Sequence, residues 1–228
     1  MAKLSNLKYF IKESPSLLKM YRLIKNGYWF KRSYKKRING KGNKIKIDGS
    51  AVLVNCKFNI NGDYNEISIN HSSLLKNVTF FIKGNYNKIK ISDNVQFFRG
   101  SSLWIEDENC EIIGDNSTFE DAHLAATENN SKIIIGSGCM FAYDIDVRTG
   151  DSHSIIDSTT NRRINYAKDV FIGNHVWVAS HVSILKGVNI LSNSVVATRS
   201  VVTKGSQKEN VLLGGGSFKI IERKYRLG

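Results

Sequence analysis

Hydrophobic and polar positions recur every 22 residues along the chain from residue 42 onward. The same short text returns as "GNKIKIDGS", "DYNEISINHS", "NYNKIKISDN", "NCEIIGDN" and "NSKIIIGSG", each time around an isoleucine. The isoleucines of this series are Ile47, Ile69, Ile91, Ile113 and Ile135. A second series is predicted to share their register: Phe58 with Phe80, and Ile60 and Ile82 with Trp104. Short β-type segments joined at Asn and Gly corners, repeated at this period, indicate a solenoid whose coils bury their inward side chains by stacking.

A shorter period of six residues follows, from Val170 to Val202. Its leading positions are Ile172, Val178, Ile184, Ile190, Val196 and Val202. Two residues before each comes a small or apolar residue: Val170, Val176, Val182, Val188, Ser194 and Ser200. Three such units make one triangular coil of 18 residues, and the 22-residue coils upstream add a four-residue corner loop. The pattern therefore predicts an all-β solenoid over residues 42–213.

The rhythm is interrupted between the two periods, after the segment "RTGDSHSIID" that runs from Arg148 to Asp157. The next residues, 158–168, read "STTNRRINYAK" and fit neither period. We interpret them as a loop extruded from the solenoid, with His153 at its edge. Residues 214–228 form a separate C-terminal segment in this prediction.

Positive charge is concentrated in an N-terminal arm, residues 1–41, which holds twelve Lys and Arg residues and one acid, Glu13. That is a net charge of +11 out of +13 for the chain. Within the arm, "SPSLLKMYRLIKNG" predicts a helix, with Ser14 as N-cap, Pro15 at the first helical position and Gly27 as C-cap. Basic arms suit anionic partners, so the arm is expected to pack on the body or to contact a membrane surface or an acidic glycan. No nucleic-acid-binding module is recognisable in the sequence, so nucleic acid is not expected as a partner.

Apolar stretches, the N-terminal sequence and the cysteines indicate where in the cell the protein is expected to be. No stretch approaches the ~20 apolar residues that a membrane span needs, and the N-terminus lacks a signal-peptide pattern. Three cysteines without CxxC spacing (Cys56, Cys110 and Cys139) indicate reduced thiols. We expect a cytoplasmic protein, with a possible peripheral contact at the inner face of the membrane through residues 1–41.

The six-residue units resemble those of the hexapeptide-repeat acyltransferases, which are left-handed parallel β-helices. The resemblance is sharpest over residues 169–222: "IGNHVWVASHVSILKGV" is similar to a segment of bacterial sugar and polysaccharide O-acetyltransferases, and "NSVVATRSVVTK" and "ENVLLGGGSFKIIER" to their closing coils. The resemblance implies a homotrimer with active sites between subunits and acetyl-CoA as the acyl donor. It also implies a catalytic histidine 24 residues before the tryptophan of "GNHVW", which is the distance from His153 to Trp177.

The chemistry suits a histidine, because attack of a sugar hydroxyl on a thioester needs a base whose pKa lies near the working pH. His153 is the predicted base. A carboxylate often fixes the tautomer of such a base, and Asp146, Asp151 and Asp157 are the candidates nearby. Strand-type alternation favours Asp151, although a turn role after Gly150 explains it equally well.

The resemblance also implies residues for the two substrates. Trp177 would lie beside the reactive end of acetyl-CoA, Ser180 and Thr198 beside its pantetheine arm, and Lys204 and Lys219 at its phosphates. The sequence departs from the family in "ATRS", where Thr198 takes the place of the usual small residue, so these assignments hold to within about a residue. His123 and Arg148 are predicted to contact the acceptor. His175 and His181 are six residues apart and so lie on successive faces, which argues against a zinc site, and no metal is expected.

The sequence thus predicts an acetyl-CoA-dependent O-acetyltransferase that modifies a sugar hydroxyl of a bacterial surface polysaccharide. Two alternatives stay open. One keeps the enzyme and changes the acceptor, to an amino sugar nucleotide acetylated on nitrogen or to another small molecule. The other is a β-solenoid scaffold without catalysis.

Overall fold

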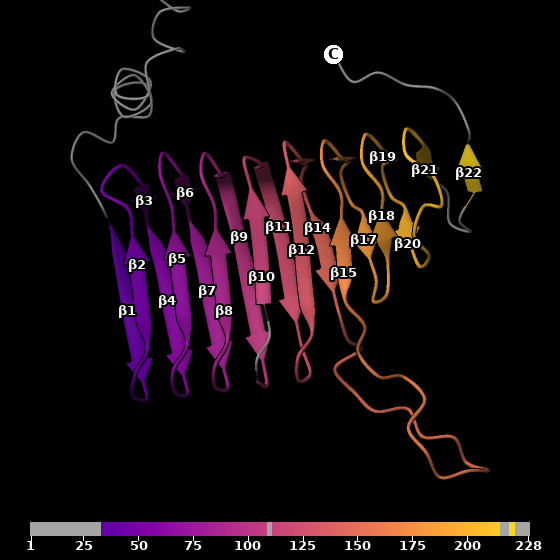
Figure 1. Cartoon of the computed structure of the whole chain (residues 1–228), viewed down its shortest axis with the longest axis horizontal. Coiled ribbons are helices and arrows are strands. Elements are labelled where there is room, and N and C mark those ends of the chain that lie inside the picture. The colour runs from indigo at the N-terminus through magenta and orange to yellow at the C-terminus, as the bar shows by residue number, and fades with distance from the viewer. Residues whose placement is uncertain (1–32, 109–110, 215–218, 222–228) are drawn as a thin grey trace, which may run out of the picture.

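The computed structural model describes residues 33–108, 111–214 and 219–221. The predicted N-terminal helix lies outside these residues. The described chain is an elongated stack of β-coils that progresses from indigo at β1 to yellow at β21, with one long loop projecting from it (Figure 1). Its strands are β1 (Tyr34–Asn39), β2 (Lys44–Ile47), β3 (Val52–Val54), β4 (Cys56–Asn61), β5 (Glu66–Ile69), β6 (Leu74–Lys76), β7 (Val78–Lys83), β8 (Lys88–Ile91), β9 (Gln96–Glu106), β10 (Glu111–Asp115), β11 (Thr118–Ala126), β12 (Lys132–Ser137), β13 (Met140–Phe141), β14 (Ile145–Arg148), β15 (Val170–Ile172), β16 (Trp177–Val178), β17 (Ser183–Ile184), β18 (Asn189–Ile190), β19 (Val195–Val196), β20 (Val201–Val202), β21 (Leu212–Gly214) and β22 (Lys219–Ile221).

The strands stack in parallel rows that form three faces of a prism. The first face contains β3, β6, β13, β16, β19 and β21, with the opening residues of β9 and β11. The second face contains β1, β4, β7, β14, β17 and β20, with the closing residues of β9 and β11. The third face contains β2, β5, β8, β10, β12, β15 and β18. Every pairing is parallel except that of β21 with β22, so the predicted parallel β-helix is confirmed.

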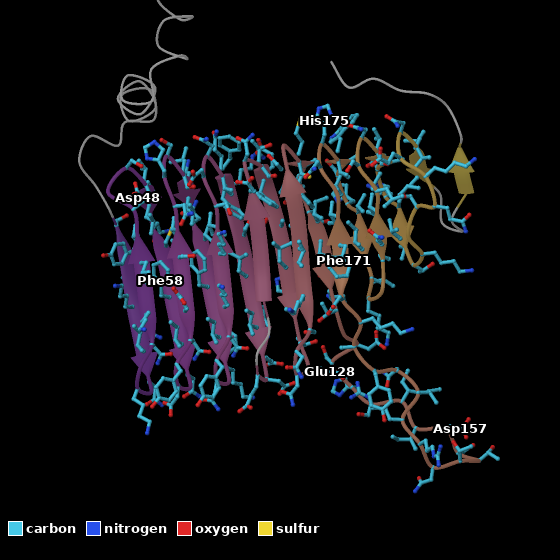
Figure 2. All side chains as sticks on the ribbon, viewed as in Figure 1. Asp48, Phe58, Glu128, Asp157, Phe171 and His175 are labelled. Atoms are coloured by element: carbon cyan, nitrogen blue, oxygen red, sulfur yellow. The ribbon has the colours of Figure 1, made fainter. Side chains whose placement is uncertain are left out.

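The core runs along the axis of the prism and is built from the inward residues of each coil. All twelve leading and preceding positions of the six-residue repeat are buried, as the pattern predicts. In the longer coils, phenylalanines from successive turns lie face to face, with ring centroids 4.7 Å apart for Phe58 and Phe80 and 4.6 Å for Phe119 and Phe141. These distances match the ~4.8 Å spacing of neighbouring strands. Figure 2 marks Phe58 at the start of one such ladder.

The Asn and Gly corners of the 22-residue coils have specific structural roles. Asn65 is buried, and its side-chain amide donates to the Asn43 side chain and to the Gly84 carbonyl, while its Oδ1 accepts from the backbone of Asn87. Gly62 has a φ of 134°, and a Cβ there would lie 2.0 Å from the carbonyl oxygen of Gly84. Only glycine fits so close an approach of two coils. The repeated text of the sequence is therefore a ladder of polar corner contacts.

The register differs from the prediction in one coil. Phe97 pairs with Leu75, 22 residues earlier, but Ser101 pairs with Val78, 23 residues earlier, so one extra residue enters β9 between them. The position predicted for Trp104 is consequently wrong. Ile105, and not Trp104, aligns with Ile82, and Trp104 aligns with the outward-facing Phe81.

Ile113 is displaced by the same insertion. It opposes Lys90 and Ile134, whereas the pattern placed it in line with Ile91 and Ile135. The register is restored after a second irregularity between Ile113 and Asp115, so that Ser117 and Cys139 are buried in the row predicted for them.

Two predicted boundaries also shift. β1 pairs with β4 in the regular register, so the solenoid begins before residue 42 and the arm is shorter than expected. The projecting loop spans everything between β14 and β15, so His153 lies within it and not at its edge.

The phenylalanine ladder makes a stability prediction. Phe119 stacks on Phe97 and on Phe141, so Phe119→Ala removes two ring contacts and opens a cavity in the core. We expect a loss of about 3–5 kcal/mol in the free energy of unfolding, measured by denaturant titration. Tyr86→Ala is the matched control, because Tyr86 also stacks on a ring one coil away, Tyr64, but lies on the surface. Equal effects of the two substitutions would contradict the assignment of the ladder to the core.

Candidate active site

The long loop leaves the prism at the corner between the second and third faces and is fastened at its foot. The backbone N–H of Lys168 donates to the Thr149 carbonyl at 2.9 Å, which closes the loop. Glu128, one coil earlier, forms an ion pair with Arg163 and accepts from the Ala167 N–H at 3.2 Å. Figure 2 labels Glu128 at the foot and Asp157 near the tip. The loop is thus held in one orientation by the preceding coil.

The Asn165 side chain binds the segment of the loop that carries His153 and holds it in place. Its side chain is buried, with 7% of the residue exposed. Its Nδ2 donates to the His153 carbonyl at 2.7 Å and to Asp151 Oδ2 at 2.9 Å, and its Oδ1 accepts from the Ile155 N–H at 2.7 Å. One amide therefore holds the backbone that follows the predicted base and the Asp151 side chain that precedes it.

The His153 side chain is exposed, and within the described residues of a single chain its imidazole has no hydrogen-bond partner. Asp151, predicted to orient it, binds the ammonium of Lys186 and the amide of Asn165 instead. The hydrogen bond from Lys186 holds the pKa of the Asp151 carboxyl below its usual range. Asp151 thus anchors the foot of the loop, and its contact with His153 stays a prediction.

Hydrogen bonds within the loop order its tip, which exposes apolar side chains to solvent. Asp157 Oδ1 accepts from the N–H groups of Thr159 and Thr160, and Ile156 forms an antiparallel bridge with Arg163. The exposed apolar residues of the loop are Ile155, Ile156, Ile164 and Tyr166, each more than half exposed. So many exposed apolar side chains on one projection indicate a protein contact.

The second face carries a polar cluster beside the foot of the loop. His123 on β11 is hydrogen-bonded to Ser102 on β9 through Nδ1. Asp146 on β14, which pairs with His123 in the register, binds Arg148 through two hydrogen bonds of 2.7 and 2.9 Å. Burial lowers the pKa of the His123 imidazole, while hydrogen bonding to Asp146 raises the pKa of Arg148. The two predicted acceptor contacts, His123 and Arg148, are therefore neighbours.

Three of the residues predicted for acetyl-CoA, Trp177, Ser180 and Thr198, lie elsewhere on the prism. Trp177 is on β16 of the first face, with 41% of the residue exposed. Thr198 Oγ1 donates to the Ser180 carbonyl at 2.8 Å, so these two residues stack at successive turns of one corner. Lys204 is exposed after β20, and Lys219 lies on β22. In Figure 1, β19, the neighbour of β16, lies at the opposite edge of the stack from the loop.

His153 and Trp177 therefore do not meet within the described part of one chain. No hydrogen bond or ring contact joins them: Trp177 lies on the first face, and the loop that carries His153 leaves the corner between the other two. Sequence analysis also missed Asn165, Glu128 and Lys186, which hold the loop. No repeat marks these residues, and only the folded chain brings them together.

The described residues give little support to a cysteine nucleophile or a metal site. Burial raises the pKa of the Cys56 thiol to about 11, and it raises that of Cys139 as well, so both are core residues and poor nucleophiles. Among the described residues, no group of three His, Cys, Asp or Glu side chains is placed to hold a metal ion. The described part of the chain likewise contains no helix long and apolar enough to span a membrane.

Two curated relatives share sequence with the chain. A polysialic acid O-acetyltransferase from Neisseria meningitidis is 40% identical over 60 residues, which is 26% of this chain and 27% of that protein. A polysialic acid O-acetyltransferase from Escherichia coli O1:K1 is 37% identical over 65 residues, 28% of this chain and 21% of that protein. The matches thus span about a quarter of the relatives' length, and no family model matches the chain.

Two solved structures are similar over nearly the whole chain. The polysialic acid O-acetyltransferase OatWY superposes with a TM-score of 0.80 at 29% identity, covering 86% of this chain and 92% of that one. The polySia-specific acetyltransferase NeuO superposes with a TM-score of 0.75 at 28% identity, covering 87% and 90%. The chain therefore has the hexapeptide-repeat β-helix fold of the bacterial polysialic acid O-acetyltransferases, which it resembles over most of its length.

Proposed function

We propose that this protein is an acetyl-CoA-dependent O-acetyltransferase that esterifies sugar hydroxyls of an acidic bacterial capsular polysaccharide. The observation that carries the proposal is the similarity to two polysialic acid O-acetyltransferases over about nine-tenths of their length. The 24-residue spacing of His153 and Trp177 and the clamped loop add support from the chain itself.

His153 acts as the general base in this proposal. Its neutral imidazole takes the proton of the sugar hydroxyl as the oxygen attacks the thioester carbonyl carbon of acetyl-CoA, and the imidazolium returns the proton as the thiol leaves. An exposed imidazole on a fixed backbone suits this role, because it keeps both ring nitrogens available while its position is set by Asn165. Rigid placement of the base lets both substrates react as if in one molecule.

Acetyl-CoA would lie along the first face and its corner with the second. The residues there fit such a ligand: Trp177 offers an exposed ring, and Ser180 and Thr198 form a polar step one coil apart. Lys204 and Lys219 would provide cations for phosphate groups. A thioester held there is remote from His153 of the same chain.

Each active site would therefore form between two copies of the chain, in a homotrimer. The apolar loop tip supports this arrangement, because Ile155, Ile156, Ile164 and Tyr166 need a partner surface. Docking of the loop on a neighbouring subunit would carry His153 to that subunit's Trp177. The contact of residues 1–41 with a membrane surface stays a prediction. The cytoplasmic location of the protein stays a prediction as well.

The test is acetyl-CoA turnover, followed as free-thiol release, with a panel of polysialic acid, a neutral capsular polysaccharide and amino sugars. We expect thiol release that depends on the acidic glycan, and a product whose acetyl groups are removed by mild alkali, as esters are and amides are not. An alkali-stable product on an amino sugar would establish N-transfer instead. If the protein did not bind acetyl-CoA, the remaining hypothesis would be a β-solenoid scaffold without catalytic activity.

A further inference from the structure

We propose that a groove on the second face, over the first three coils, is an auxiliary binding site for the acidic acceptor polysaccharide, separate from the place where the acetyl group is transferred. The proposal rests on the function proposed above and adds to it a second point of contact with the polymer. The groove lies on β1, β4 and β7, which pair side by side toward the indigo end of the stack, whereas the His153 loop projects from its orange part (Figure 1).

The groove arises from the alternation of side chains along paired strands. Its cavity volume of about 470 Å³ lies within the range of about 300–1,000 Å³ that is usual for sites of small ligands. Two outward rows border it: Arg37, Asn59 and Phe81 align on successive coils, and Asn39 aligns with Asn61. The isoleucines between these rows on the second and third coils are buried, so the backbone there forms the floor.

The polar lining of the groove suits a carboxylated sugar. Arg37 supplies an exposed guanidinium, and none of the residues that line the groove is acidic. The asparagine amides both donate and accept, as sugar hydroxyls do. Asn39 Nδ2 donates to Asn61 Oδ1 at 3.0 Å, a bond that uses the oxygen of the Asn61 amide and not its N–H groups. Guanidinium and amide donors therefore line a groove that holds no competing carboxylate.

Phe81 gives the groove an aromatic wall. Its ring stacks on that of Trp104 with centroids 3.8 Å apart, so Trp104 covers one face. The other face is directed toward Asn59, one coil earlier, and Phe81 stays partly exposed in the groove. An apolar ring face beside a few convergent polar groups is typical of ligand sites, and it matches a sugar ring, whose faces are apolar and whose edge is polar.

Cations beside the groove extend the site for a polymer. Lys35 and Lys57 align in the next outward row of the same strands, adjacent to Arg37 and Asn59, and both lysines are exposed. A face that carries several cations attracts a polyanion more strongly than a single charged sugar, because each repeat of the polymer adds a charge. The groove and its rim thus favour an acidic polysaccharide.

A second groove at the same end of the solenoid differs in charge. It has a cavity volume of about 500 Å³ and lies on the third face and the adjoining corner. Its lining includes Asp48 and Asp93 as well as Lys46. The two carboxylates disfavour an anionic ligand, so this groove, although equal in size, is the natural comparison site.

The distance from the groove to the loop requires a long acceptor. Asn59 and Arg148 occupy one outward row four coils apart, which is about 19 Å at a strand spacing of ~4.8 Å. Arg148 is the last residue of β14, from which the His153 loop departs. A polymer held in the groove therefore needs several sugar residues to reach the loop. Binding at two points raises the effective concentration of the polymer at the base.

The experiment measures acceptor and donor kinetics with long-chain polysialic acid, together with its direct binding by calorimetry. Arg37→Gln removes the cation, and Asn59→Asp places a carboxylate of nearly the same size in the groove. We expect each to raise the acceptor KM about tenfold and to weaken binding equally, because each removes or opposes a contact with a charged group. The kcat at saturating polymer and the KM for acetyl-CoA should not change, since the groove touches neither the reacting sugar nor the donor.

The matched controls are Lys46→Gln and Asn70→Asp. Both residues line the second groove, and the substitutions change the net charge by the same amounts as the test variants. We expect wild-type acceptor KM in both controls. An equal rise in KM in tests and controls would show that only the overall charge of this end matters, and would overturn the groove as a site.

Three further results would also overturn the groove. Unchanged polymer KM and affinity in both test variants, with wild-type turnover present, would place the polymer elsewhere and leave the proposed function intact. A change in oligomeric state by light scattering in either test variant would assign the groove to subunit contact. A wild-type chain that binds acetyl-CoA but neither binds nor acetylates the polymer would remove the acidic acceptor and the groove together.

Discussion

His153→Ala is expected to abolish acetyl transfer to the glycan while leaving acetyl-CoA binding intact. Removing a positioned general base costs about 10²–10⁴-fold in rate, and the loop sequence contains no second imidazole to replace it. The imidazole is exposed and makes no bond within the described chain, so its loss should not disturb the clamp around its backbone. The measurement is kcat for thiol release with saturating acceptor, beside the affinity for acetyl-CoA.

The matched control is His71→Ala. His71 is also exposed, but it lies at the far end of the solenoid, where its Nδ1 meets the Ser50 hydroxyl. We expect wild-type turnover in this variant. Added imidazole should partly restore His153→Ala, because the vacated site would admit a free base. Full turnover in His153→Ala would show that another group removes the proton.

Most of the fold could be predicted from the sequence because a solenoid is periodic. Each coil repeats the environment of the last, so one inward position predicts the others, as the buried row of Ala51, Ser73, Val95, Ser117 and Cys139 confirms. The prediction went wrong where the period changed by one residue, at β9. Because side chains alternate between the two sides of a strand, a single insertion exchanges inward and outward residues, which moved Trp104 to the surface.

The candidate site was less predictable for a related reason. A spacing shared with a family could single out His153 and Trp177, but it could not show that the loop carrying His153 and the face carrying Trp177 are separate in one chain. The residues that position the loop come from three separate segments, Glu128, Asn165 and Lys186, and no local pattern joins them. Such long-range contacts are fixed by the stacking of coils, which the sequence reveals only in outline.

Asn165→Ala is expected to lower kcat about 10²-fold with little change in either KM, because small misplacements of a catalytic group cost that much. The substitution removes the bonds to the His153 carbonyl and Asp151 and leaves the Ile155 N–H without its acceptor. The loop projects from the prism, so this damage is local, and the midpoint of thermal unfolding should barely move. Amide hydrogen exchange at Ile155 should accelerate, which reports the released clamp directly.

Two further variants separate positioning from mere packing. Asn165→Asp preserves the size and the acceptor for Ile155, but its second oxygen would face the His153 carbonyl and the Asp151 carboxylate, which are both acceptors. It should therefore be as impaired as Asn165→Ala at neutral pH, although the acceptor for the Ile155 N–H is retained. Ser158→Ala, at the exposed tip, should behave as the wild type. If Asn165→Asp were fully active at neutral pH, the donated hydrogen bonds would be dispensable, and the orientation of His153 would depend on the Glu128 and Lys186 anchors instead.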